Sequence, residues 1–241
     1  MFSVYESREI VKNYLAELHV ATKAMKPLLV IFNPRSIPEF YKAIEKINGI
    51  SKLWIKYFPQ DEAYIKAREF FLQSDYTHFM ILPDDLIVTQ EDVDAIVNSH
   101  ESYDSISGWC NNNGRDDTNI DTNISAFLPP DPPRAATYEG YRWFKIAYFE
   151  SLISKVKDSD VIIPVLHQGF ALSRLSRRLV EQVPFRTDAG CCVDSCLSLD
   201  LMKFRVGFTQ YVDIRIRMKH LKIPRSELLV GKEKAKILLE N

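Results

Sequence analysis

Two adjacent carboxylates, Asp84 and Asp85, stand where an apolar run ends. The run from Phe79 to Leu82 is bounded by proline and aspartate, a pattern typical of a buried strand, although Pro-Asp-Asp is also ordinary turn chemistry. Because unpaired charges are costly to bury, we expect the aspartates at the rim of a sheet. In open α/β sheets, ligands bind at the rim formed by the carboxyl ends of the strands. The pair therefore predicts a site for Mg²⁺ or Mn²⁺ that holds a diphosphate.

Strand and helix patterns alternate around this pair through the first hundred residues. The predicted strands are 28–32, 53–58 and 79–82. The predicted helices are 5–24, 36–47 with a capping box from Ser36, 61–72 with Asp61 as its cap, and one capped at 89–92. Such alternation implies parallel strand–helix–strand units with helices on both faces of the sheet. The expected fold class is α/β, with a mixed, mostly parallel sheet flanked by helices.

The second half of the chain contains further elements and a region rich in turn formers. The predicted strands are 105–109, 161–166 at an edge or irregular position because of Pro164, and 211–218 with alternating apolar and charged residues. The predicted helices are 173–182 and 194–204, and turn formers are dense at 111–117 and 129–133. Aromatic residues gather between Tyr138 and Tyr148, and this clustering suits either stacking on a sugar or a core helix.

Glycine-rich phosphate-binding loops are missing from the sequence. Neither G-x-G-x-x-G after a strand nor G-x-x-x-x-G-K-[ST] occurs. The loop after the first predicted strand is Asn33-Pro-Arg-Ser36, which contains no glycine. This argues against a classical dinucleotide-binding domain, a P-loop enzyme and a nucleotidyltransferase.

Composition bounds the class of protein. The 241 residues are 46% hydrophobic with a net charge of −1, which predicts one globular domain over 1–241 and no nucleic-acid partner. Residues 201–241 hold ten Lys or Arg against four Asp or Glu, a local net charge of about +6. That basic region suits a phosphorylated ligand, a nucleic acid or an anionic membrane surface, or is simply a solvated face.

The cysteines and the apolar segments bear on localisation. Cys191 and Cys192 are adjacent, which is poor disulfide geometry, and the four cysteines lack zinc spacing. Reduced thiols, the mixed N-terminal residues and the lack of an 18-residue apolar stretch predict a cytoplasmic protein without a transmembrane segment. Peripheral contact with a membrane remains compatible with the basic C-terminal region.

The order of these parts resembles the nucleotide-sugar glycosyltransferases of the glycosyltransferase-A fold. The matching parts are Pro83-Asp-Asp85, Gly169 in His-Gln-Gly-Phe, Asp194 in Gly-Cys-Cys-Val-Asp, and His220, over residues 27–221. One departure is Pro83, which stands where the family has its first aspartate. The resemblance implies a Rossmann-like fold with a nucleotide-binding half at 27–104, an acceptor half at 105–221 and a C-terminal tail at 222–241.

The resemblance also implies roles for individual residues. Asp85 and His220 would bind the divalent metal, Mn²⁺ or Mg²⁺. Asp194 would be the general base that takes the proton of a hydroxyl acceptor, giving inversion at the sugar. The donor-binding residues would be Asn33, Arg35, Asp84 and Gly169, with Asp84 on the ribose or on a metal-bound water.

Several alternatives stay open at this point. Asp194 also suits an ordinary helix cap, His220 a surface histidine at a strand end, and Asp188 and Asp200 are nearby substitutes for the base. Candidate phosphate partners are Arg174, Arg177, Arg178, Arg215 and Arg217. Retaining enzymes share the scaffold. The alternative function is a nucleotide- or glycan-binding protein on the same fold whose catalysis has decayed, which Pro83 favours.

Overall fold

The computed structural model describes residues 25–112, 121–126, 142–156, 161–188, 192–204, 208–221 and 235–241. The predicted helix at 5–24 and the turn-rich segment at 129–133 lie outside these residues, as does most of 111–117. No helix within the described ranges is long and apolar enough to cross a membrane.

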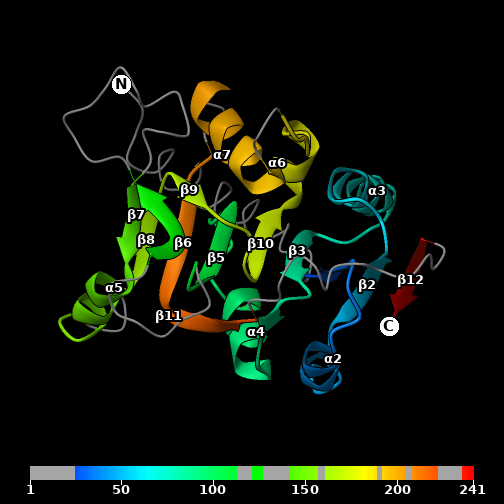
Figure 1. Ribbon diagram of the computed structural model, residues 1–241. Helices are drawn as coiled ribbons and strands as arrows, with labels where there is room; N and C mark the ends of the chain where they lie inside the picture. The colour runs from blue at the N-terminus through cyan, green and yellow to red at the C-terminus, as the bar shows by residue number, and fades with distance from the viewer. Residues whose placement is uncertain are drawn as a thin grey trace, which may run out of the picture.

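A nine-stranded sheet forms the centre of the molecule, and its strands run β12-β2-β1-β3-β10-β5-β11-β4, with β8 paired to β11 (Figure 1). These strands are β1 (Pro27–Asn33), β2 (Ser51–Lys56), β3 (His78–Pro83), β4 (Leu86–Ile87), β5 (Ser105–Cys110), β8 (Ile162–Val165), β10 (Ser173–Ser176), β11 (Gln210–His220) and β12 (Lys236–Glu240). A second, three-stranded sheet has the order β7-β6-β9 and consists of β7 (Arg142–Lys145), β6 (Asp121–Ala126) and β9 (His167–Gln168).

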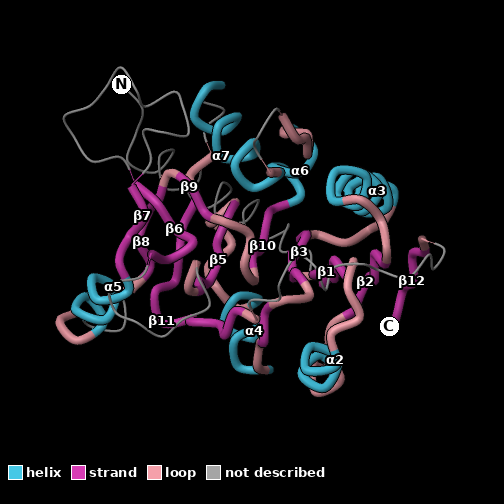
Figure 2. Tube along the Cα trace, in the orientation of Figure 1, coloured by secondary structure: helices cyan, strands magenta, loops and turns pink. Residues whose placement is uncertain are grey.

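Helices cover both faces of the large sheet, as Figure 2 shows in the contrast of cyan helices and magenta strands. They are α2 (Pro38–Ile44), α3 (Gln60–Gln73), α4 (Gln90–Val97), α5 (Ile146–Ile153), α6 (Arg177–Gln182) and α7 (Val193–Phe204). One apolar core joins the sheet to α3, α6 and α7, and another joins its opposite face to α2 and α4. A third cluster packs α5 against β6, β8 and β11. The α/β class and the two helical layers predicted from the sequence are confirmed.

The sheet is more mixed than the sequence predicted. Parallel pairing joins β1 to β2 and to β3, as expected from the strand–helix alternation, and also β5 to β11. The intervening strand β10 runs antiparallel to both β3 and β5, and β12, β8 and β4 also pair antiparallel. The prediction of a mostly parallel sheet was therefore wrong, because strands from late in the chain enter it antiparallel.

Strand β10 also corrects a helix prediction. The pattern at 173–182 predicted one helix, but Ser173–Ser176 is a strand and only Arg177–Gln182 is helical. Ladder hydrogen bonds on both sides stabilise Ser173–Ser176 as a strand and outweigh its local helical pattern. The hydroxyl of Ser176 then accepts a hydrogen bond from the Leu179 amide and so caps α6.

Two of the predicted helix caps were wrong and one is confirmed. Helix α2 begins after Ile37 with a proline in its first turn, and the Ser36 hydroxyl lies 2.9 Å from the Tyr57 hydroxyl instead. Helix α3 begins after Pro59, which places Asp61 inside the first turn. A proline can start either helix because its missing N–H is not needed there. At α4, Thr89 and Asp92 form the predicted capping box.

The remaining strand predictions agree with the structure, with one exception inside β11. Apolar residues of β11 alternate inward as predicted, but Asp213 is also buried and is neutralised by Arg215 at 2.8 Å. Strand β8, which contains Pro164, pairs with β11 and lies off the main path of the sheet, as the proline predicted. The predicted tail at 222–241 ends in β12, which pairs with β2.

Candidate functional site

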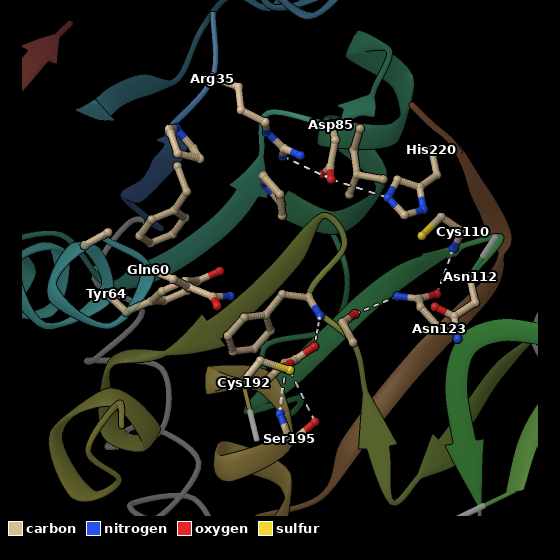
Figure 3. A pocket seen from close by; sticks show the side chains of 18 of the residues that line it. Arg35, Gln60, Tyr64, Asp85, Cys110, Asn112, Asn123, Cys192, Ser195 and His220 are labelled. Atoms are coloured by element: carbon tan, nitrogen blue, oxygen red, sulfur yellow. Dashed lines mark hydrogen bonds and ion pairs between the residues drawn. The ribbon is translucent and has the colours of Figure 1, made fainter. Parts of the chain in front are cut away.

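A cavity of about 530 Å³ lies at the carboxyl ends of β1 and β3. From the first part of the chain, the end of β1, the start of α3 and the turn after β3 line it. From the later part, the end of β5, strand β6, the β9–β10 loop, the start of α7 and the end of β11 line it. Five predicted site residues line it: Arg35, Asp85, Gly169, Asp194 and His220. Figure 3 shows Arg35, Asp85 and His220 along one side and Cys192 and Ser195 on the opposite side.

Asp84 is fully buried behind the wall of the cavity rather than in its lining. One of its carboxylate oxygens accepts hydrogen bonds from the Arg35 amide at 2.8 Å and from Asn33 Nδ2 at 3.1 Å. The other accepts from Arg35 Nε at 2.7 Å, and Arg35 Nη2 pairs with the same oxygen. Burial raises the pKa of Asp84 to about 6, even though the guanidinium opposes that shift. Asp84 therefore holds the loop that carries Arg35.

Asn33 lies in the same layer as Asp84. Its side-chain oxygen accepts a hydrogen bond from the Tyr41 hydroxyl at 2.7 Å, and it is fully buried. The predicted donor-binding residues Asn33 and Asp84 thus contact Arg35 and Tyr41, and neither lines the cavity. Both aspartates lie in the turn that follows β3, where Asp84 is buried in the fold and Asp85 lines the cavity.

Asp85 lies between two cationic side chains. Its Oδ2 atom is 3.0 Å from Arg35 Nη2 and 3.4 Å from His220 Nε2. The other ring nitrogen of His220, Nδ1, is 2.9 Å from the Asn111 carbonyl oxygen, so both ring nitrogens face acceptors. Burial alone would lower the pKa of His220, but Asp85, Cys110 and the Asn111 carbonyl together raise it to about 10. Burial would likewise raise the pKa of Asp85, yet His220 and Arg35 hold it below its usual value.

The surroundings of Asp85 decide how a divalent cation would fit. Among the described residues, no three His, Cys, Asp or Glu side chains are gathered as a metal site. Asp85 and His220 offer two converging donor atoms, and Mg²⁺ is commonly held by one or two carboxylates together with substrate phosphates and water. The pair fits a site that substrate oxygens complete, provided that His220 loses its proton when the metal binds.

On the opposite side, Asp194 is fixed at the start of α7. Its Oδ1 accepts from the Ser195 amide at 2.8 Å, and its Oδ2 accepts from the Phe170 amide at 3.3 Å. The Cys192 thiol also donates to Oδ1, at 2.5 Å. The carboxylate is half-buried at the cavity wall, where it can accept a proton from a bound hydroxyl.

Gly169 brings the β9–β10 loop close to β6. A side chain at this position would place a Cβ 3.1 Å from the Asn123 carbonyl oxygen and 3.4 Å from Asp194 Oδ2. The Gly169 amide donates to the Asn123 carbonyl at 2.7 Å, and Asn123 Nδ2 donates to the Gly169 carbonyl at 2.6 Å. The loop therefore sits where it can present the Phe170 amide to Asp194.

Aromatic rings form a third wall of the cavity. Phe32 and Tyr64 stack with ring centroids 3.9 Å apart, and Tyr64 stacks on Phe170 at 5.4 Å. Burial raises the pKa of the Tyr64 hydroxyl well above its usual value, and the charges of Asp194 and Asp85 raise it further. The hydroxyl therefore stays neutral, and the rings offer a flat apolar surface to a base or a sugar.

Sequence reasoning missed Tyr64, Phe170, Asn123 and His167, all of which line the cavity. His167 and Phe170 flank the glycine of the His-Gln-Gly-Phe motif, so that motif carried a signal for them. His167 Nε2 lies 3.2 Å from the Ser195 hydroxyl, and burial lowers the pKa of this histidine. Tyr64 gave no local signal, because an aromatic residue on a helix usually belongs to the core.

The candidate phosphate-binding arginines contact other parts of the fold. Arg174 is fully buried and donates to the carbonyls of Val97, Ser99 and His100, each at 2.9 Å. Arg177 donates to carbonyls at the end of α3, and Arg178 pairs with Asp104. The C-terminal end of β10 pairs with the start of β3, which puts α6 at the opposite edge of the sheet from the cavity. Arg215 and Arg217 are exposed, as their alternation in β11 predicted.

The substitutes for Asp194 lie outside the cavity lining. Asp200 is buried and pairs with Arg186 at 2.6 Å. Asp188 is exposed and lies 3.4 Å from the same arginine. Among the three acidic residues considered for the base, Asp194 alone lines the cavity.

Comparisons with known proteins leave the family open. No protein-family model matches the chain, and no curated protein matches it. Among solved structures, the chain is similar to the crystal structure of A197 from STIV, with 15% identity, a TM-score of 0.44, and coverage of 87% of this chain and 98% of A197. At that identity and TM-score the similarity assigns neither a family nor a function.

Proposed function

We propose that this chain is a glycosyltransferase of the glycosyltransferase-A fold, which moves a sugar from a nucleotide-diphosphate donor to a hydroxyl acceptor. One observation carries the proposal. Segments far apart in sequence bring the cations Arg35 and His220 to one side of a cavity and the carboxylate Asp194 to another, with stacked aromatic rings along the wall. In the proposed reaction the diphosphate would lie against the two cations, a base or sugar ring would lie against the aromatic rings, and Asp194 would take the proton.

Arg35 and His220 would bind the diphosphate. A guanidinium fork matches phosphate geometry, and a protonated imidazole donates a charge-assisted hydrogen bond. Fixed cations at the position where negative charge develops stabilise a leaving group. When a divalent cation is bound instead, Asp85 and the deprotonated His220 would hold it, and the cation would supply the positive charge that the imidazolium otherwise gives to the same phosphates.

Asp194 would act as the general base. The amides of Phe170 and Ser195 hold its carboxylate in one orientation. The acceptor hydroxyl would give its proton to Asp194 as its oxygen attacks the sugar carbon from the face opposite the diphosphate. The bond from that carbon to the diphosphate oxygen breaks as the new bond forms, so the sugar is transferred with inversion and the nucleoside diphosphate leaves. Tyr64 and Phe170 would pack on the donor and keep water from that carbon.

The test is a thermal-shift panel with UDP, GDP, CMP and their sugars, each with Mn²⁺, Mg²⁺ or EDTA. A ligand that binds only the folded state raises the melting temperature, and about 100-fold excess over Kd adds about 2.7 kcal/mol. We expect one class of nucleotide to shift the protein, and Asp85→Ala to lose the part of the shift that needs metal. The control Asp75→Ala removes an exposed carboxylate beyond the other end of β3 and should leave the shift unchanged.

A second function is favoured by one observation. Pro83 replaces an acidic residue of the family pattern, and Arg35 already pairs with both Asp84 and Asp85. These features suit a nucleotide- or glycan-binding protein without catalysis. If a nucleotide still raises the melting temperature in EDTA, the transferase proposal stands, and Arg35 and His220 neutralise the diphosphate without a metal. If no nucleotide raises the melting temperature, the result contradicts both the glycosyltransferase and the nucleotide-binding protein.

A further inference from the structure

Strand β12 forms one end of the large sheet and exposes an apolar edge. It pairs antiparallel with β2, with Leu238 opposite Trp54. Ile237, Leu238 and Leu239 are 38%, 42% and 43% exposed. Successive residues of a strand point to opposite faces, so the edge is apolar on both faces. In the described part of the chain, no strand pairs with the outer side of β12.

We propose that β12 is a dimerisation edge that pairs antiparallel with β12 of a second copy of this chain. The N–H and C=O groups on the outer side of an edge strand are a template for a further strand. Closed homodimers place the same patch of both copies around a twofold axis. The inference does not depend on the proposed function.

The residues of β12 are complementary to themselves in one register. With the twofold axis at Leu238, antiparallel pairing sets Leu238 opposite Leu238 of the second copy and Ile237 opposite Leu239. The same register sets Lys236 opposite Glu240 at both ends of the strand pair. Apolar pairs and opposite charges across an antiparallel ladder are each stabilising. The segment Lys-Ile-Leu-Leu-Glu therefore matches its own copy residue by residue.

The charges that neighbour β12 within one copy also favour a second copy of the chain as its partner. Within one copy, Lys236 lies opposite Lys56 of β2 and Glu240 lies opposite Lys52. Like charges that face each other across a ladder are destabilising. In the dimer, Lys236 gains an acidic neighbour from the second copy, which offsets the repulsion from Lys56. The core-side neighbours of Ile237 and Leu239 are Ile55 and Leu53, so the apolar layer beneath α3 continues across the axis.

The test measures the mass of the full chain in solution across a range of concentrations by sedimentation or light scattering. We expect a dimer of twice the chain mass of 27.9 kDa. Lys236→Glu and Glu240→Lys should each weaken dimerisation about tenfold or more, because each puts like charges at both ends of the strand pair. The double variant Lys236→Glu/Glu240→Lys restores opposite charges and should dimerise like the natural chain.

The control is Lys155→Glu, an exposed charge reversal just after α5, which lies on the far side of the sheet from β12 (Figure 1). It should leave the dimer intact, and the melting temperature of every variant shows that it remains folded. A monomer at all concentrations overturns the proposal. The proposal is also overturned if neither single charge reversal weakens the dimer. It is likewise overturned if the double variant is folded but remains monomeric.

Discussion

At the scale of single residues, Arg35 gives the adjacent carboxylates Asp84 and Asp85 different surroundings. Its backbone amide and Nε hold the buried Asp84, while its Nη2 reaches Asp85 at the cavity. One guanidinium can serve both because it has several donors in a fixed plane. Asp84 consequently acts as a support for Arg35, whereas Asp85 lines the cavity beside His220.

Removing Arg35 should make stability strongly dependent on pH. In Arg35→Ala, Asp84 stays buried without its cation, and we expect a loss of about 3 kcal/mol of unfolding free energy at pH 8. The pKa of Asp84 in the folded protein is already raised to about 6, above the value in an unfolded chain, and it rises further without Arg35. The folded state then binds a proton that the unfolded state lacks, so the variant regains stability as the pH falls through 6 toward 4.

Urea unfolding at pH 8 and pH 5 measures this effect. The double variant Arg35→Ala/Asp84→Asn is the control, since a neutral amide needs no cation and should recover part of the loss at pH 8. An equal loss at both pH values would show that Arg35 stabilises the fold by packing rather than by its charge.

A second prediction at this scale concerns the proposed base. Asp194→Asn keeps the size and one acceptor of the side chain but cannot take a proton at neutral pH. We expect transfer to fall by about 10²–10⁴-fold while the thermal shift with the donor nucleotide stays within error. Asp200→Asn is the matched control for a buried aspartate outside the cavity; it should lower stability and spare transfer per folded molecule. Full activity in Asp194→Asn would exclude this residue as the base.

At the scale of elements, β10 joins the two halves of the sheet and is anchored by Arg174. The guanidinium of this buried residue donates to three carbonyls at the end of α4 and just after it. Such carbonyls are left without partners where a helix ends, and a buried one is costly to leave unpaired. Arg174 therefore fixes α4 to the central strand.

Arg174→Met should cost about 3 kcal/mol of unfolding free energy, because it leaves three carbonyls without their donor. Arg178→Met is the matched control four residues further along the chain at an exposed position, where the ion pair with Asp104 should contribute less than about 1 kcal/mol. Chemical denaturation measures both. Comparable losses in the two variants would contradict the capping role of Arg174.

His78, at the start of β3, should make the fold sensitive to acid. Burial, together with the charge of Arg174, lowers its pKa to about 4. The neutral form is thus favoured in the folded state, so its contribution to stability is present above the unfolded pKa of about 6.5 and is lost as the pH falls toward 4.

We expect His78 to account for about 2 kcal/mol of destabilisation between pH 6.5 and 4. The measurement compares urea unfolding of the natural chain with that of His78→Asn across this range. The variant should show a flatter dependence on pH. Parallel curves would assign the acid sensitivity to the carboxylates instead.

At the scale of the whole molecule, residues 27–104 and residues 105–221, the two halves distinguished in the sequence, contribute strands to one sheet. Strand β10 of the second half lies between β3 of the first half and β5. The apolar core beneath α3 also includes residues of α6 and α7, such as Leu179 and Leu197. Neither half can therefore bury its apolar surface alone.

A fragment of residues 1–104 should consequently lack cooperative folding, whereas the full chain should unfold in a single transition seen equally by near- and far-ultraviolet circular dichroism. The matched truncation after residue 221 removes β12, an edge strand, and should remain folded. A sharp unfolding transition in the 1–104 fragment would show that the first half is an independent domain.

The sequence by itself determined the local features of this protein. Apolar runs predicted the strands β1, β2, β3 and β5, and the capping box at Thr89 predicted the start of α4. Five residues chosen for chemistry, among them Asp85, Asp194 and His220, line one cavity. These predictions succeeded because the burial pattern and the end of a strand depend on residues that are neighbours in the sequence.

Only the tertiary structure decided which residues of those patterns face the cavity and how the strands are ordered. Asp84 and Asp85 are indistinguishable in sequence, and the direction of the chain after β3 buries one and presents the other. Ser173–Ser176 is a strand because β3 and β5 both pair with it, and Arg174 is buried for that reason. Tyr64 belongs to the cavity because α3 packs over Phe32. Contacts between distant segments carry no local signal, since they depend on how the whole chain packs.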